Sequence, residues 1–237
     1  MDNQKFLQVI KASFKKFLIT GSRSNEKLKI LHGAIANDII EKLNDETYSV
    51  NSLGIGRGQE STIRGRYIDK KVDITITKNE DVVAGIGVKF VMQNYSQNSN
   101  NYFENMLGET ANIRSRSIPY FQIFIIPDVL PYYDTYGNIK NWESFTEHNV
   151  IKYITLSKDD IETSIHTPTK TLLFVVHLPE PDTEIYNKQD YIKYYSTLTP
   201  LEIYTTNINY GKFESSVIFN NYENFINKLI CYLKFIE

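Results

Sequence analysis

The sequence predicts a mixed α/β fold in which an antiparallel meander and parallel strands form one sheet flanked by helices. Three observations predict it. Apolar residues recur at helical spacing through the first 43 residues. Residues 71–91 alternate between apolar and polar side chains, as strands with two different faces do. Two continuous apolar runs follow at 119–128 and 170–179, which is typical of strands buried on both faces of a sheet.

Two amphipathic helices are expected at the N-terminus. Gly21 is expected to end the first, and Ser24 is a favourable N-cap for the second. Their apolar stripes consist of Phe6, Val9, Ile10, Phe14, Phe17 and Leu18, and of Leu28, Leu31, Ile35, Ile39 and Leu43. Extended segments and a glycine-rich loop then lead to the alternating region.

The alternating region predicts a strand over 71–77 (KVDITIT) and a second over 82–91 (VVAGIGVKFV), joined by a turn. The core-facing residues are Val72, Ile74 and Ile76 in the first strand, and Ala84, Ile86, Val88 and Phe90 in the second. The opposite face carries Asp73, Gly85, Gly87 and Lys89. The length of the turn places Asp73 across from Gly87 and beside Lys89.

The rest of the chain predicts a helix over about 100–114 that connects to the buried strands by a right-handed crossover, so that these strands are parallel. A last amphipathic helix is expected over 220–236. We expect one domain over 1–237. Its core spans about 25–128, and the half over 129–237 is expected to extend the sheet and to carry specificity or dimerisation elements.

Composition limits the function classes. The net charge of −2 argues against a purely electrostatic nucleic-acid binder, although a local basic cleft remains open. The single cysteine, Cys231, excludes an internal disulfide and is expected in the core. No signal peptide or membrane span is expected, which favours a cytoplasmic protein.

Asp73 and Lys89 have two interpretations: an ion pair on a solvated sheet face, or a chemical site. The pattern VDI…GVKF, followed by a polar turn, a helix and a buried strand, resembles the nuclease core of the PD-(D/E)XK superfamily, in particular type II restriction endonucleases. The resemblance covers about 25–128. It implies a restriction-endonuclease-like core, a homodimer, and magnesium-dependent cleavage of double-stranded DNA.

The resemblance also implies roles for individual residues. Asp73 matches a magnesium ligand, and Lys89 matches the lysine that contacts the attacking water or the scissile phosphate. Val88 matches a position whose backbone carbonyl reaches the metal. These groups suit phosphodiester hydrolysis because negative charge accumulates on the phosphorus oxygens in the transition state. The glycines of this strand are expected to leave room for a phosphate backbone.

Gly87 departs from the family pattern, which has an acid at this position. Three explanations are open. In the first, the acid has migrated to the following helix, where Glu109 is preferred over Glu104 as a catalytic and metal-binding residue. In the second, an acid at position 87 has been replaced in a variant of an active enzyme. In the third, catalysis was lost and DNA binding was retained.

Further residues are candidates for the same cleft. Glu60 precedes the meander and is a candidate additional metal ligand. The candidate DNA contacts are Arg57, Arg64, Arg66, Gln93, Asn94, Arg114 and Arg116. For the last two arginines, an equal alternative is interaction with the helix dipole. For Gln93 and Asn94 the alternative is a capping loop.

Other chemistries find less support. GIGRG (54–58) lacks the spacing of a nucleotide-binding loop, and no G-x-S-x-G motif occurs. The histidines His32, His148, His166 and His177 show no metal-ligand spacing, and His177 is expected to be structural. A structural or interaction protein with an incidental Asp–Lys pair is a further, lower-ranked alternative.

Overall fold

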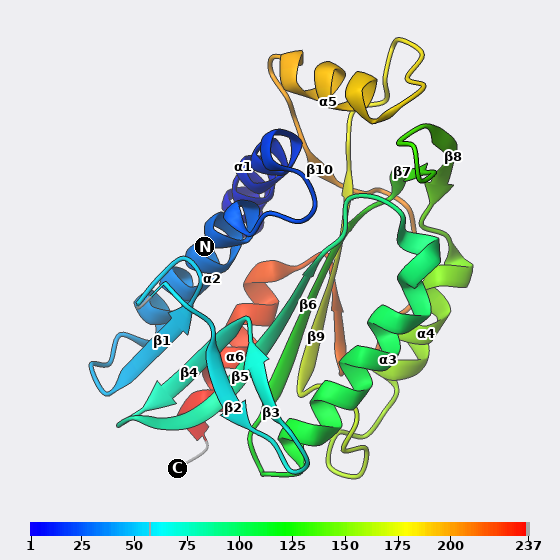
Figure 1. Cartoon of the computed structure of the whole chain (residues 1–237). Coiled ribbons are helices and arrows are strands. Elements are labelled where there is room, and N and C mark those ends of the chain that lie inside the picture. Colours follow the sequence, from blue (N-terminus) through cyan, green and yellow to red (C-terminus); the bar gives the residue numbers. More distant parts are fainter. Residues whose placement is uncertain (57, 236–237) are drawn as a thin grey trace.

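A computed structural model describes residues 1–56 and 58–235. Its centre is a mixed seven-stranded sheet in the order β1-β4-β5-β6-β9-β10, with β11 also paired to β9 (Figure 1). The strands are β1 (Tyr48–Ser52), β4 (Ile74–Lys78), β5 (Asp81–Phe90), β6 (Tyr120–Pro127), β9 (Lys170–His177), β10 (Tyr204–Thr205) and β11 (Val217–Phe219). Strands β1, β4 and β5 are antiparallel and β5, β6 and β9 are parallel, so the predicted mixed sheet is confirmed.

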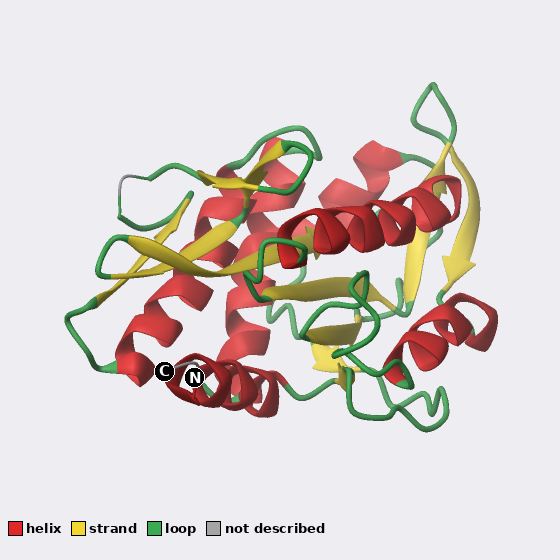
Figure 2. Ribbon diagram, turned by 90° about the horizontal axis from the view of Figure 1, so that it is seen from below, coloured by secondary structure: helices red, strands yellow, loops and turns green. Residues whose placement is uncertain are grey.

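Helices cover both faces of the sheet (Figures 1 and 2). One face carries α1 (Asn3–Thr20), α2 (Glu26–Leu43) and α6 (Tyr222–Phe235), and the other carries α3 (Tyr95–Arg114) and α4 (Glu147–Ser157). Helix α5 (Lys188–Thr197) adds Tyr191 and Tyr195 to the core, where both rings contact Phe14 of α1. No described helix is long and apolar enough to cross a membrane.

The region 71–77 is not one strand, so this prediction is wrong. Strand β3 (Asp69–Val72) pairs with β2 (Ser61–Arg64) in a separate hairpin, and β4 begins only at Ile74. Val72 therefore packs with Ile63 and Tyr120, away from the cluster that contains Ile74. The chain changes sheets at Asp73, which places its carboxylate at the junction between the hairpin and the main sheet.

Helix α3 begins at Tyr95, about one turn before its predicted start. The cause is the second hairpin, formed by β7 (Val129–Tyr133) and β8 (Ile139–Ser144). The buried Glu143 carboxylate of this hairpin accepts hydrogen bonds from the backbone N–H groups of Tyr95 (2.8 Å) and Ser96 (3.2 Å). A carboxylate at this position satisfies free N–H groups and complements the positive end of the helix dipole.

The last helix, α6, is confirmed, but the expectation for Cys231 is wrong because this residue is exposed. The buried stripe of α6 consists of Tyr222, Phe225, Ile226, Leu229, Ile230 and Leu233. Cys231 belongs to the side of the helix that this stripe leaves in solvent.

The glycine face of β5 is covered, so the expectation that it leaves room for a phosphate backbone is also wrong. A Cβ atom at Gly85 would lie 2.9 Å from Ile63 Cδ1, and one at Gly87 would lie 2.6 Å from both Gln122 Oε1 and Tyr120 Oη. Tyr120 and Gln122 are each 1% exposed. Glycine is required here because the hairpin and the side chains of β6 approach the strand closely.

We expect Gly87→Ala to lower the free energy of unfolding by about 1–3 kcal/mol, because the added methyl group must displace buried side chains. Gly108→Ala is the matched control. Gly108 lies within α3 and a Cβ atom there meets nothing within 4 Å, so alanine should raise stability by about 0.5–1 kcal/mol. Urea unfolding of both variants measures this, and equal stability of Gly87→Ala and the wild type would contradict the packing.

Candidate metal centre and its surroundings

The candidate site lies beside the first residue of β4, Ile74, beyond which β5 is paired with β6 on its other edge. Ile74 pairs with Ile86, which confirms the predicted register and sets Asp73 at the level of Gly87. The N–H groups of Gly85 and Val91 point to β6, so by alternation the backbone N–H and C=O of Val88 point to the other edge. There the Val88 N–H donates to Asp73 Oδ2 (2.6 Å). The Val88 N–H thus contacts the Asp73 carboxylate, and a role of the Val88 carbonyl as a metal ligand stays a prediction.

Two further side chains meet Asp73 at this edge. One ligand-type atom each from His32, Glu60 and Asp73 lie within 4.8 Å of one another. Opposite ligands of a magnesium ion are about 4.2 Å apart, so small side-chain adjustments would bring the three atoms to one cation. Glu60 thus lies at the candidate metal site for which the sequence named it.

A close contact between helix and loop brings His32 and Glu60 to the same place. His32 lies on α2, and Glu60 ends the loop that follows β1. This loop crosses α2 so closely that a Cβ atom at Gly54 would lie 2.1 Å from the Lys29 carbonyl oxygen and 2.6 Å from Gly33 Cα. Two glycines permit this approach, and the loop then returns toward the sheet with Glu60 at its end.

Burial dominates the electrostatics of the site. It raises the pKa of Asp73, and the hydrogen bond from Val88 and the charge of Lys89 oppose this rise. Burial also lowers the pKa of His32 to about 4, so its imidazole is neutral near pH 7. The half-buried Lys89 is close enough to influence both groups. The site thus combines carboxylates, a neutral imidazole and a nearby ammonium group.

Glu109 occupies a neighbouring position. Its carboxylate pairs with Lys70 Nζ of the β2–β3 hairpin (2.6 Å) and accepts a hydrogen bond from Tyr120 Oη (3.2 Å). Its charge contributes to the raised pKa of Asp73, which shows that it is near, but it is not part of the group formed with His32 and Glu60. Glu104 is exposed. A catalytic role for Glu109 stays a prediction.

The predicted DNA contacts separate into two sets. Arg64, Arg66 and Arg116 are exposed, the first two on the hairpin and its turn. Arg114, in contrast, donates to the backbone carbonyls of Ile161, Ser164 and Thr167, and so fastens α3 to the segment after α4.

The two predicted amide contacts also differ. The side chain of Asn94 exchanges two hydrogen bonds with the backbone of Tyr133 in β7, and it does not cap α3 although Asn94 occupies the N-cap position. Gln93 lines a cavity of about 540 Å³ together with Arg23 and Lys27. Arg57 lies outside the described residues.

Sequence reasoning missed His32. Its distance in sequence from Glu60 and Asp73 gives no metal-ligand motif. One signal was available: His32 lies four residues after Leu28 and three before Ile35, and therefore within the apolar stripe of its helix. A polar residue in such a stripe is buried and needs a partner.

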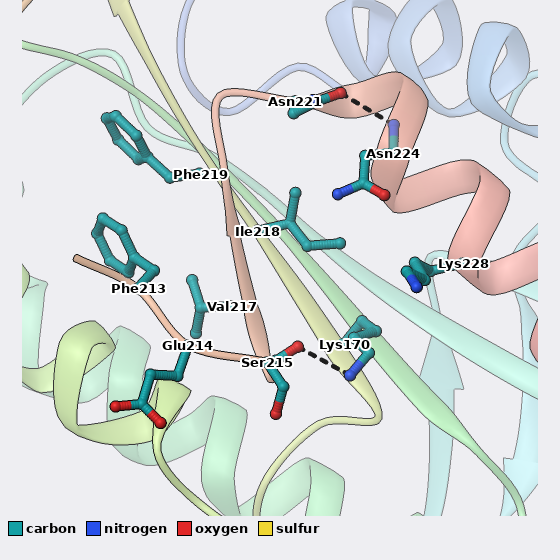
Figure 3. Close-up of a pocket in the computed structure, with 10 residues that line it drawn as sticks. All are labelled: Lys170, Phe213, Glu214, Ser215, Val217, Ile218, Phe219, Asn221, Asn224 and Lys228. Atoms are coloured by element: carbon teal, nitrogen blue, oxygen red, sulfur yellow. Dashed lines mark hydrogen bonds between the residues drawn. The ribbon is translucent and has the colours of Figure 1, made fainter.

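Another cavity lies away from this site, at the sheet edge formed by β11 and beside α6 (Figure 3). Its volume is about 510 Å³. Lys170 donates to the Ser215 carbonyl oxygen (2.8 Å), and Phe213 stacks on Phe219. Glu214 is the only acid in its lining among the described residues, so this cavity lacks the paired acids of the centre at Asp73.

We expect Asp73→Asn to stabilise the metal-free protein at pH 7. Asparagine still accepts the Val88 hydrogen bond but avoids burying a charge. Because burial raises the pKa of Asp73, the cost of burying its negative charge is present above the folded-state pKa. This cost disappears as the pH falls below the pKa that aspartate has in the unfolded chain. The stability advantage of the variant, measured by thermal unfolding, should therefore shrink in acid.

The same variant should lose stabilisation by a divalent cation. In the wild type, an ion at 100 times its Kd adds about 2.7 kcal/mol to the free energy of unfolding. The exposed Asp182 provides the control, and Asp182→Asn should leave both properties unchanged. A cation that stabilises Asp73→Asn as strongly as the wild type would contradict the site.

Comparisons of the chain with protein-family models, curated proteins and solved structures found no match. They assign no family to the chain. The chemistry available to it is therefore inferred from the geometry of the described residues, above all from the convergence of His32, Glu60 and Asp73 beside Lys89.

Proposed function

We propose that this protein is a magnesium-dependent, site-specific endodeoxyribonuclease that hydrolyses phosphodiester bonds in double-stranded DNA. The observation that carries the proposal is the meeting of Asp73, Glu60 and the Val88 backbone near Lys89, at an edge of β5 that none of the described strands covers. Carboxylates and a lysine in this arrangement suit a reaction in which charge builds up on a phosphate. With the separate β2–β3 hairpin set aside, the order α2, β1-β4-β5, α3, β6 supports the resemblance to restriction endonucleases.

Each residue has a proposed task. Asp73 and Glu60 hold the cation, and the Val88 carbonyl adds a neutral oxygen on the same edge. When bound, the cation supplies positive charge to the phosphate and lowers the pKa of a water molecule. Lys89 contacts the scissile phosphate or orients the attacking water, and its charge stabilises the developing negative charge.

The substrate contacts are proposed to come from exposed cations around this edge. Arg64 and Arg66 of the hairpin and Arg116 beyond α3 are available for phosphate groups. Cleavage of both strands at a symmetric sequence requires two equivalent sites, so we propose that the protein acts as a homodimer.

A catalytically silent DNA-binding protein is the second candidate. It is favoured by Gly87, where the resemblance implies an acid, and by the engagement of Glu109 with Lys70. The remaining explanation, a replaced acid at position 87, finds little support because Tyr120 and Gln122 occupy the space that a side chain there would need.

Incubation of the purified protein with phage or plasmid DNA and Mg²⁺ should give discrete fragments. Lys89→Met should lower the cleavage rate by about 10²- to 10⁴-fold, as expected for loss of a group that moves protons or stabilises charge. Lys158→Met, at an exposed position that ends α4, is the control and should cut at the wild-type rate.

Specific DNA binding in a gel-shift assay without cleavage under any divalent cation would favour the silent binding protein. Unchanged cleavage by both Asp73→Asn and Lys89→Met would contradict the assigned site. Absence of DNA affinity even at low salt would contradict both candidates.

Glu60 and Glu109 should differ in their importance for cleavage. Glu60→Gln removes a carboxylate from the group around Asp73 and should lower the rate by about 10²-fold or more. Glu109→Gln breaks the pair with Lys70, so a smaller, roughly tenfold loss is expected from a less firmly held hairpin. The reverse ranking, measured as single-turnover rates, would make Glu109 the second carboxylate.

A further inference from the structure

His32 is the most unusual side chain in the described structure. It is 0% exposed, and neither ring nitrogen has a hydrogen-bond partner in the described part of the chain. Leaving a buried polar group without a partner is unfavourable, so such a group calls for an explanation. One of its nitrogens lies within 4.8 Å of carboxylate oxygens of both Glu60 and Asp73.

We propose that His32 is a protein ligand of the cation at this centre, and that it makes the centre prefer a first-row transition-metal dication such as Mn²⁺ over Mg²⁺ and Ca²⁺. The proposal deepens the proposed function and rests on its metal site. It does not require that the protein cuts DNA.

The donor atoms support this choice of ion. Mg²⁺ and Ca²⁺ take oxygen ligands and gain little from an imidazole nitrogen, whereas transition-metal dications bind it well. The carboxylates of Asp73 and Glu60 make the rest of the centre rich in oxygen, which suits Mn²⁺. A nitrogen beside these oxygens therefore changes which ion is held.

The environment of His32 also suits a ligand. A histidine must be neutral to bind a metal, and burial keeps the pKa of His32 well below neutral pH, although the nearby charge of Glu60 opposes this effect. The helix is fixed by the Gly33–Gly54 contact next to His32. This contact fixes the backbone from which the imidazole projects, and the complete burial of His32 limits the motion of its ring.

Titration calorimetry with Mn²⁺, Mg²⁺ and Ca²⁺ alone, without DNA, tests the preference. We expect one ion per chain and an affinity for Mn²⁺ at least about tenfold above that for Mg²⁺. His32→Asn and His32→Gln place an amide near one or the other ring nitrogen. Each should weaken Mn²⁺ binding by about 10- to 100-fold or more and change Mg²⁺ binding much less. The exposed His148 supplies the control, His148→Gln.

A spectroscopic measurement on the wild type keeps the proposal testable if both His32 variants fail to fold. Electron spin echo envelope modulation of bound Mn²⁺ should show coupling to an imidazole nitrogen in the wild type and in His148→Gln. Absence of nitrogen coupling in the wild type would overturn the proposal. So would folded His32 variants that bind Mn²⁺ and Mg²⁺ with the same affinities as the wild type.

The outcomes separate the two proposals. Nitrogen-coupled Mn²⁺ in a protein that never cuts DNA would leave the role of His32 intact and remove the nuclease. If the wild type and His32→Gln both cleave DNA at equal rates with Mg²⁺ and with Mn²⁺, the proposed role of His32 is wrong and the nuclease function stands.

Discussion

The hydrogen bond between the Val88 N–H and the Asp73 carboxylate is the interaction on which the candidate site depends. Strand β4 begins at Ile74, opposite Ile86, while β5 runs on to Phe90, so the Val88 N–H on this edge of β5 has no described strand to satisfy it. Asp73 takes this donor at 2.6 Å, a short distance that is typical of charge-assisted bonds. The bond fixes the carboxylate, one oxygen of which lies within 4.8 Å of ligand-type atoms of both His32 and Glu60.

The position of Asp73 depends in turn on how firmly the β2–β3 hairpin is held, because the chain passes from β3 directly into this residue. Helix α3 holds the hairpin at two points. Glu109 pairs with Lys70, and the buried Asn112 accepts from the Tyr67 N–H (2.9 Å) and donates to the Ile68 carbonyl oxygen (2.8 Å). The acids and amides of α3 therefore act on the site through the hairpin.

The sequence predicted those features that depend on side-chain periodicity within one element. The mixed sheet, the parallel order of β5, β6 and β9, and the register that sets Asp73 opposite Gly87 are examples. Contacts between segments that are distant in the sequence could not be predicted from this periodicity. The alternation of apolar and polar residues continues unchanged through Asp73, although the chain passes from one sheet to another at this residue. The cap that starts α3 comes from Glu143, 47 to 48 residues later in the chain. The grouping of His32 with Glu60 depends on the Gly33–Gly54 contact, which no local pattern reveals.

Contacts between β5 and β6 explain why position 87 is a glycine. The PD-(D/E)XK pattern that the sequence resembles has an acid at this position of the strand, but in this protein Tyr120 and Gln122 fill that space and leave none for a side chain. Any second carboxylate must therefore reach the edge of β5 from another element. Glu60 does so from the loop that crosses α2, and the same crossing brings His32 of that helix to the edge. The donors thus come from one strand junction, one loop and one helix. Such a centre is assembled by the tertiary fold: β5 contributes no side chain at position 87, and helix α2 contributes the imidazole of His32.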